Sequence, residues 1–328
     1  RQMCIRDRIN TQGVSKKPLV SFIIPVYNLP SSMVIECLDS ILMLSLDAQN
    51  CEIIVVDDGS DTSLLGALNA YLDKIVYIRQ PNQGAASARN MGLCVAKGEY
   101  IQFVDGDDSL IPFVYEHCLD LVRCQDAEMV KFDLTRNKKQ KNTYSVEGPM
   151  TGSQYMSSHN LKVAVCSMLF KRDLLCGLRF TPGLLNEDEE FTPLLILRTE
   201  RLYITDAKAY YYRKRDNSCT TSKNKKTQLQ RLQDTLRILG QFQQRIDTLP
   251  PIERNALQRR IAQLSMDYIY NVARYTNSLH RLETALQEMR RHGLYPLPDK
   301  KYTRKYSLFR RLIRTKAGRY LLILMTLR

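Results

Sequence analysis

Apolar segments alternate with helical patterns from residue 18 to residue 104, and this alternation constrains the fold more than any other feature of the chain. The expected strands are residues 18–26, 51–56, 75–79 and 100–104, and the expected helices begin at Ser31 or Ser32 and cover residues 63–72 and 85–96. The first strand, PLVSFIIPV, is apolar throughout, which is typical of a strand covered on both faces. Strands that alternate with helices at this spacing predict an α/β fold: a mostly parallel, Rossmann-like sheet flanked by helices.

Two of these strands run into acidic side chains. The segments IIVVDDGSDT and GEYIQFVDGDDSLIP carry the acids, which are Asp57, Asp58, Asp105, Asp107 and Asp108. The carboxyl ends of parallel strands meet at one edge, where open α/β sheets bind their ligands. An Asp-x-Asp pair there offers only oxygen ligands, which suit a hard divalent cation that also holds a diphosphate. The pattern therefore predicts a site for a nucleotide-activated substrate.

The termini, cysteines and histidines restrict the remaining classes. Residues 3–8 read MCIRDR, which resembles the translation of a sequencing adapter, so residues 1–8 are excluded from the fold prediction as a probable sequencing artefact. The nine cysteines form no CxxC pair, which indicates buried thiols in a reducing cytoplasm. The four histidines are scattered and predict no zinc site. Neither a transmembrane segment nor a signal peptide is expected.

The positive charge gathers at the C-terminal end of the chain. The net charge is +14, and from Arg290 onward twelve basic residues face the single acid Asp299. We therefore predict a boundary between residues 18–223 and a basic, helical extension at residues 224–328. Residues 307–327 form a pattern with apolar side chains on one helical face and arginines beside it. This helix is expected either to dock on the domain or to lie on an anionic membrane.

Five motifs resemble the family 2 inverting glycosyltransferases, which have the GT-A fold. In chain order they are PVYN, VDDGSDT, NQGAASARN, VDGDD and NEDEEF. The resemblance covers roughly residues 18–220. It implies that a sugar passes from a nucleotide-diphospho-sugar, UDP-linked in most of the family, to a saccharide or lipid-linked acceptor. It also implies a cytoplasmic bacterial enzyme of cell-surface polysaccharide synthesis, with contact to the inner face of the plasma membrane as one expectation.

The resemblance assigns the nucleotide pocket to the first two strand ends and the turn after them. The carboxylate of Asp58 would accept a hydrogen bond from the base, usually uracil, with Asp57 beside it. The backbone around Pro25 and Tyr27 would line the base pocket. Gly84 would turn the chain into a helix whose N-terminal N–H groups face an anion. From the residues alone, Asp-Asp-Gly-Ser also suits a simple turn or helix cap.

The resemblance places the chemistry on residues that are far apart in the chain. Asp107 would bind Mn²⁺ or Mg²⁺ bridging the diphosphate, and Asp105 would contact the ribose or the waters of the metal. Arg89 would face the nucleotide site. Asp188 would be the general base that takes the proton of the acceptor hydroxyl. Arg213 would belong to a loop that closes over the diphosphate.

Simpler roles remain open for two of the acidic segments. Either Asp108 or Ser109 can cap the helix that begins near Pro112. The acids from Glu187 to Glu190 can complement the dipole of a helix N-terminus.

Other functions fit the sequence less well. A sugar nucleotidyltransferase would show a glycine-rich phosphate loop after the first strand, and PVYNLPSS lacks one. A basic nucleic-acid-binding protein would use the charged tail, but no helix-turn-helix, zinc-finger or RNP-like pattern accompanies it, so no nucleic-acid partner is expected. An NAD-dependent oxidoreductase is excluded because no GxGxxG follows a strand.

Overall fold

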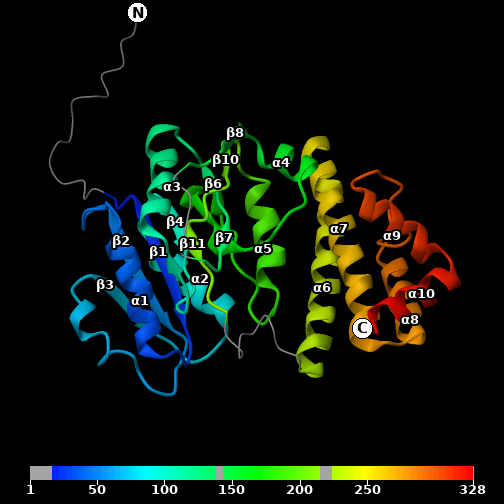
Figure 1. The fold of residues 1–328 in the computed structure, drawn as a ribbon, viewed down its shortest axis with the longest axis horizontal. Helices are drawn as coiled ribbons and strands as arrows, with labels where there is room; N and C mark the ends of the chain where they lie inside the picture. Colours follow the sequence, from blue (N-terminus) through cyan, green and yellow to red (C-terminus); the bar gives the residue numbers. More distant parts are fainter. Residues whose placement is uncertain (1–16, 138–142, 215–223, 328) are drawn as a thin grey trace, which may run out of the picture.

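The computed structural model describes residues 17–137, 143–214 and 224–327 (Figure 1). Its centre is an eight-stranded sheet in the order β3-β2-β1-β4-β9-β6-β10-β8. The strands are β1 (Val20–Val26), β2 (Cys51–Asp57), β3 (Ile75–Arg79), β4 (Tyr100–Phe103), β6 (Met129–Lys131), β8 (Val146–Met150), β9 (Met168–Lys171) and β10 (Leu202–Thr205). Neighbouring strands among β1–β4 pair in parallel, as do β6 and β10, whereas β9 and β8 run antiparallel to their neighbours. The predicted, mostly parallel α/β sheet is confirmed.

Helices cover both faces of this sheet because successive residues of each strand point to opposite sides. The helices of this part are α1 (Ser31–Leu42), α2 (Ala85–Val95), α3 (Pro112–Cys124), α4 (Gly152–Ser158) and α5 (Glu187–Ile196). Phe22 and Ile24 of β1 join the apolar cluster that contains α1 and α3. Ile23 between them joins the cluster that contains α2, α4 and α5. The carboxyl ends of β1, β2 and β4 thus open at one edge of a sheet with two packed faces.

A second, three-stranded sheet lies beside the Asp-x-Asp segment. Its strands are β5 (Ser109–Leu110), β11 (Tyr210–Tyr211) and β7 (Leu134–Thr135), in the order β5-β11-β7. The apolar segment at residues 129–134 contributes to both sheets, because the chain leaves the large sheet after β6 and enters the small one at β7. The predicted helix at residues 63–72 is wrong: only a short 3₁₀ turn, η1 (Asn69–Tyr71), forms there. Its sequence contains Gly66 and Asn69, both weak helix formers.

Helix α1 begins where predicted, whereas the capping of α3 differs from the prediction. Helix α1 begins at Ser31 itself, after Pro30, and has no side-chain cap. Helix α3 follows Ile111, which also provides no side-chain cap. The expectation that Asp108 or Ser109 caps α3 is therefore wrong, since both lie before that position and Ser109 belongs to β5.

The C-terminal extension is helical, as the sequence predicts. It comprises α6 (Lys225–Arg245), α7 (Pro251–Thr276), α8 (Leu279–Arg291), α9 (Arg304–Arg314) and α10 (Lys316–Thr326). These helices share one apolar cluster, and α6 and α7 stand between the large sheet and α8–α10 (Figure 1). Helix α6 starts directly after Asn224, where the boundary is predicted, but the division into two domains stays a prediction. Residues 1–8 lie outside the described residues.

The single helix predicted at residues 307–327 is two helices. Thr315 separates them and accepts a hydrogen bond from the backbone N–H of Gly318, which caps α10. Ile313, Leu322 and Ile323 are buried in the cluster of the extension, so α9 docks on α7 and α10 docks on α7 and α8. Among the described residues, none of the helices combines the length and the apolar character that crossing a bilayer requires.

Candidate active site

Asp57 ends β2 and stabilises the turn that follows it. Its buried carboxylate accepts hydrogen bonds from the backbone N–H of Ser60 at 2.9 Å and the hydroxyl of Tyr77 at 2.7 Å, and it pairs with Arg79 at 3.4 Å. Burial raises the pKa of Asp57, but the hydrogen bonds from Ser60 and Tyr77 outweigh it and leave that pKa below its usual value. The carboxylate of Asp57 thus stabilises the turn through contacts with other residues of the chain. Its predicted contact with the nucleotide stays a prediction.

Asp58 holds the turn that leads into α2. Its Oδ1 accepts from the side chain of Gln80 at 2.7 Å and from the backbone N–H of Gln83 at 3.0 Å, and its Oδ2 accepts from the N–H of Gly84 at 2.7 Å. Gly84 turns the chain sharply, as predicted, with a φ of 88° that favours glycine. The N–H of Gly84 thus faces an anion from the chain itself, the carboxylate of Asp58. The predicted contact of Asp58 with a base would be additional to these bonds.

Arg89 joins three carboxylates that come from two distant parts of the chain. It lies on α2, and its side chain is 7% exposed. One guanidinium nitrogen, Nη2, bonds Asp105 at the end of β4 at 2.9 Å, and Nη1 bonds Glu187 of α5 at 2.5 Å. Nη1 also lies 3.8 Å from Oδ1 of Asp188. Burial lowers the pKa of Arg89, but the three carboxylates outweigh it and hold that pKa above its usual value.

Asp188 has the surroundings that a general base needs. It lies in the first turn of α5, its side chain is 27% exposed, and its Oδ2 accepts a hydrogen bond from the backbone N–H of Val165 at 3.1 Å. Burial raises the pKa of Asp188 to about 6, against the lowering effect of Arg89 and with a further rise from Glu187. The carboxylate is therefore ionised at neutral pH while its pKa stays close to the working range, which favours proton transfer.

The Asp-x-Asp segment is held from the small sheet by Tyr210. Its hydroxyl accepts a hydrogen bond from the backbone N–H of Asp105 at 3.0 Å and donates one to Asp108 at 2.9 Å. Asp108 is buried and also accepts from the backbone N–H of Arg213 at 2.8 Å. Burial and the neighbouring charge of Asp105 raise the pKa of Asp108 to about 8. Tyr210 is absent from the site residues predicted from the sequence, since nothing distinguishes it there from the two tyrosines that follow it.

Arg213 lies beside the predicted metal ligand Asp107. Its Nε donates to the backbone carbonyl of Asp107 at 2.9 Å, and its Nη2 pairs with Glu36 of α1 at 2.5 Å. Arg213 thus lies next to the Asp-x-Asp segment. Its contact with the diphosphate stays a prediction.

The donor atoms at this edge fit a divalent cation. Among the described residues, no group of three or more His, Cys, Asp or Glu side chains is placed to hold a metal ion. A metal at a nucleotide site needs only one or two carboxylates, because substrate phosphates and water complete its shell. Asp105 and Asp107 would supply such oxygens.

Pro25 and Tyr27 lie at the same edge, on and just after β1. Pro25 is in register with Val56 of β2, and Tyr27 is 49% exposed. The backbone N–H of Asn28 donates to the hydroxyl of Ser60 at 3.0 Å, which joins the loops that follow β1 and β2. The predicted base pocket is therefore bordered by these two loops.

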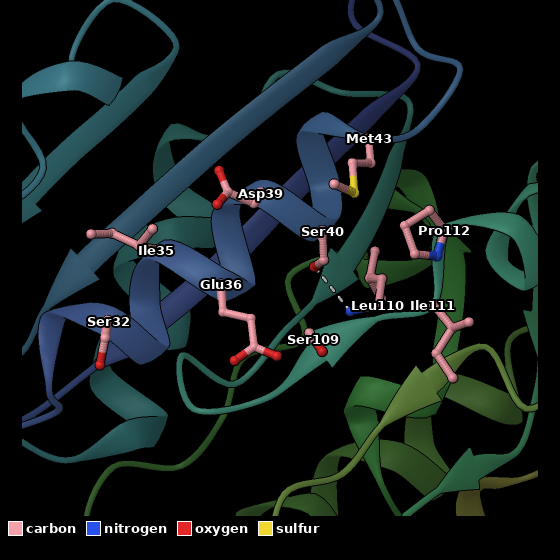
Figure 2. Close-up of a pocket in the computed structure, with 10 residues that line it drawn as sticks. All are labelled: Ser32, Ile35, Glu36, Asp39, Ser40, Met43, Ser109, Leu110, Ile111 and Pro112. Carbon is pink, nitrogen blue, oxygen red and sulfur yellow. Dashed lines mark hydrogen bonds between the residues drawn. The ribbon is translucent and has the colours of Figure 1, made fainter. Parts of the chain in front are cut away.

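A cavity of about 400 Å³ lies next to this edge, between α1 and residues 109–112 (Figure 2). The hydroxyl of Ser40 accepts a hydrogen bond from the N–H of Leu110 at 3.1 Å across it. Glu36 lines the cavity and also pairs with Arg213, so the cavity adjoins the Asp-x-Asp segment. It contains none of the site residues predicted from the sequence.

The sheet and the acidic edge define a GT-A type fold with its ligand-binding edge at β1, β2 and β4. Residues 21–174 match the family described as Glycosyl transferase family 2. The match thus covers the part of the chain that contains Asp57, Asp58 and the Asp-x-Asp segment.

Two relatives in Bacillus subtilis (strain 168) show how far the similarity extends. The uncharacterized glycosyltransferase EpsJ is 30% identical over 220 residues, covering 62% of this chain and 63% of EpsJ. The minor teichoic acid biosynthesis protein GgaB is 25% identical over 217 residues, covering 63% of this chain and 24% of GgaB. The chain thus spans less than two thirds of either relative.

Solved structures share the fold over almost the whole chain. S. aureus TarS 1-349 in complex with UDP-GlcNAc superposes with a TM-score of 0.68 at 18% identity, over 94% of this chain and 91% of TarS 1-349. The mannosyltransferase PcManGT from Pyrobaculum calidifontis, in complex with GDP-Man and Mn²⁺, gives a TM-score of 0.58 at 16% identity, over 95% of this chain and 87% of PcManGT. The likeness includes the C-terminal helices as well as the family domain.

Proposed function

We propose that the chain transfers a sugar from a UDP-linked nucleotide-diphospho-sugar to a hydroxyl of a saccharide or lipid-linked acceptor, with inversion at the anomeric carbon. The observation that carries this proposal is the contact of Arg89 with both Asp105 and Asp188. It brings the donor end of the site, at β4, next to a carboxylate suited to act as a base. TarS binds UDP-GlcNAc and GgaB belongs to minor teichoic acid biosynthesis, which supports a role in cell-surface polysaccharide synthesis.

The proposed reaction is a single displacement. The carboxylate of Asp188 takes the proton of the acceptor hydroxyl as that oxygen attacks the anomeric carbon. The bond between the anomeric carbon and the diphosphate oxygen breaks on the opposite face, and its electron pair stays on the diphosphate. An α-linked donor then gives a β-linked product. Arg89 keeps Asp188 ionised, and Val165 fixes the orientation of its carboxylate through the hydrogen bond to Oδ2.

We assign a bound Mn²⁺ or Mg²⁺ to Asp107, with Asp105 next to it. When bound, such an ion neutralises the charge that develops on the leaving diphosphate. The neighbour PcManGT, described with GDP-Man and Mn²⁺, supports this assignment. Arg213 would add positive charge on the same side, because its guanidinium lies against the backbone of Asp107.

We further propose that α9 and α10 place the enzyme on the inner, anionic face of the plasma membrane. Large apolar side chains of both helices, and of the residue after α10, are exposed to solvent, although the helices pack against the rest of the extension. These are Leu308, Tyr320, Leu321, Leu324, Met325 and Leu327. Arg311 and Arg314 of α9 and Lys316 of α10 are also exposed, and their positive charge matches an anionic surface. Arg310 and Arg319 do not contribute, since they pair with Asp299 and Glu283.

A panel of UDP-, GDP- and dTDP-sugars tests the proposed activity. Each donor is incubated with Mn²⁺ or Mg²⁺ and candidate saccharide acceptors, and both the nucleoside diphosphate released and the anomer formed are measured. We expect release of UDP from one donor and a product of inverted configuration. A retained configuration would contradict the mechanism. Formation of pyrophosphate from a sugar phosphate and a nucleoside triphosphate would instead identify a nucleotidyltransferase.

A further inference from the structure

We propose that the C-terminal helices α6 and α7 position the general base. Asp234 and Arg260 are the positioning residues, and they hold the chain on either side of Asp188. The inference rests on the proposed role of Asp188 as the base. Four independent sets of contacts lead to this conclusion.

Helix α6 holds the chain just before the base. The carboxylate of Asp234, which is 4% exposed, accepts a hydrogen bond from the backbone N–H of Leu185 at 2.9 Å. The side chain of Asn186 donates to the hydroxyl of Thr235, one residue further along α6, at 3.2 Å. Asp188 follows Asn186 by two residues. The entry into α5 is therefore fixed by α6 rather than by a cap of its own, since α5 has no side-chain cap.

Helix α7 holds the residue just after the base. The guanidinium of Arg260 forms an ion pair with the carboxylate of Glu189, and the side chain of Arg260 is only 3% exposed. A cation so deeply buried is costly unless it is paired, so this contact specifies where the first turn of α5 lies. Two arginines therefore contact this acidic turn. Arg89 lies against Glu187 and Asp188, and Arg260 pairs with Glu189.

The same helix also holds the segment that bonds the base directly. The side-chain amide of Gln263 accepts from the N–H of Leu161 at 3.2 Å and donates to its carbonyl at 3.3 Å. Four residues later, Val165 donates its N–H to Oδ2 of Asp188. Helix α7 therefore contacts both segments that meet at the base.

Apolar packing supports these polar contacts. Leu184 and Leu194, which flank the acidic turn, belong to the apolar cluster of the extension together with Leu232 of α6 and Leu257 of α7. A catalytic group must be held close to its productive geometry, and a misplacement of about 1 Å can cost about 100-fold in rate. The extension is thus placed to set the rate of proton transfer without touching the substrate.

The test compares Arg260→Met with a matched control in the full chain. Methionine keeps a long apolar side chain, and the Glu189 that it leaves unpaired is 26% exposed and can be hydrated. The control is Arg254→Met on the same helix, because Arg254 contacts backbone carbonyls within the extension, such as that of Leu249 at 3.1 Å. The measurements are kcat and donor KM, the Kd for UDP with Mn²⁺, and hydrogen–deuterium exchange of residues 184–190 and 161–167.

We expect Arg260→Met to lower kcat by about 10- to 100-fold while donor KM and UDP affinity change less than about twofold. Exchange should rise at residues 184–190 and stay unchanged in α2, and Arg254→Met should match the wild type. If Arg260→Met does not fold, the double variant Glu189→Gln/Arg260→Met replaces it, since it removes the unpaired charge at Glu189 while Lys305 remains near Asp267. A wild-type kcat in the folded variant, or equal losses of kcat and UDP affinity, would overturn the inference.

The exchange experiment separates this inference from the proposed function. A wild-type chain that releases no nucleoside diphosphate from any donor would contradict the proposed function. The comparison of exchange at residues 184–190 would still show whether Arg260 orders that segment. Unchanged exchange there in Arg260→Met would refute the positioning role whatever the activity of the enzyme.

Discussion

Replacing Arg89 by glutamine should shift the pH dependence of catalysis towards higher pH. The proposed base Asp188 is active as the ionised carboxylate, so kcat falls as pH drops through its pKa, which lies at about 6 in the wild type. Arg89 lowers that pKa from a distance of 3.8 Å between Nη1 and Oδ1. Without this charge, burial and the neighbouring Glu187 both raise the pKa of Asp188. Only the hydrogen bond from the backbone of Val165 still lowers it.

The size of the shift follows from the separation of the two charges. Unit charges at that distance interact by about 1 kcal/mol in water and by about 4 kcal/mol at an effective dielectric constant of about 20. Since about 1.4 kcal/mol corresponds to one pKa unit, the pKa of Asp188 should rise by roughly one to three units. The acidic limb of the kcat profile should therefore move from about pH 6 to between about pH 7 and pH 9.

The assay is the release of nucleoside diphosphate, measured as kcat from pH 5 to pH 9.5 with the donor that the panel identifies. Arg172→Gln is the control, because Arg172 donates to the backbone carbonyl of Ala96 at 2.7 Å and lies outside the acidic cluster. Its profile should match the wild type. An acidic limb of Arg89→Gln at or below that of the wild type would refute the assignment of Asp188 as the base whose pKa Arg89 lowers.

Three further outcomes are expected. Asp188→Asn should lower kcat by roughly 10²–10⁴ while UDP still binds, because an amide cannot accept the proton; loss of UDP binding with normal residual turnover would argue against the base. EDTA should abolish transfer, and Mn²⁺ or Mg²⁺ should restore it. Asp107→Ala should be inactive, with a Tm within a few degrees of the wild type. Full activity in EDTA would contradict the proposed metal dependence. Replacing Arg311, Arg314 and Lys316 by glutamine should weaken binding to anionic vesicles by about 100-fold, since each basic group contributes about 1 kcal/mol at such a surface; binding that is indifferent to salt and to these changes would rule out the membrane contact.

Local sequence signals predict the elements that lead to the site. The strand at Ile75–Arg79 has the predicted bounds and the helix at Pro112–Cys124 begins where predicted, because a short apolar run and a proline in the first turn are strong local signals. The helix expected at residues 63–72 fails although its apolar spacing is helical, since Gly66 and Asn69 interrupt an otherwise helix-forming run of Leu and Ala.

The contacts within the site could not be predicted from local patterns. Arg89 and Glu187 are 98 residues apart, and Arg260 and Glu189 are 71 apart, so only the folded chain brings them together. The acidic turn at residues 187–190 carries more charge than a helix dipole needs. Nothing in the sequence pattern indicates that a buried arginine of the extension pairs with one of these acids.

The position of β9 has a consequence for synthesis of the chain on the ribosome. Strands β1 to β4 are complete once Phe103 has emerged, and β4 then has one open edge. The strand that covers this edge, β9, begins only at Met168. At typical translation rates of about 5–20 residues per second, β4 stays uncovered for roughly 3–13 s. During that interval an apolar edge strand can pair with another nascent chain, which makes the first half of this protein a target for chaperones.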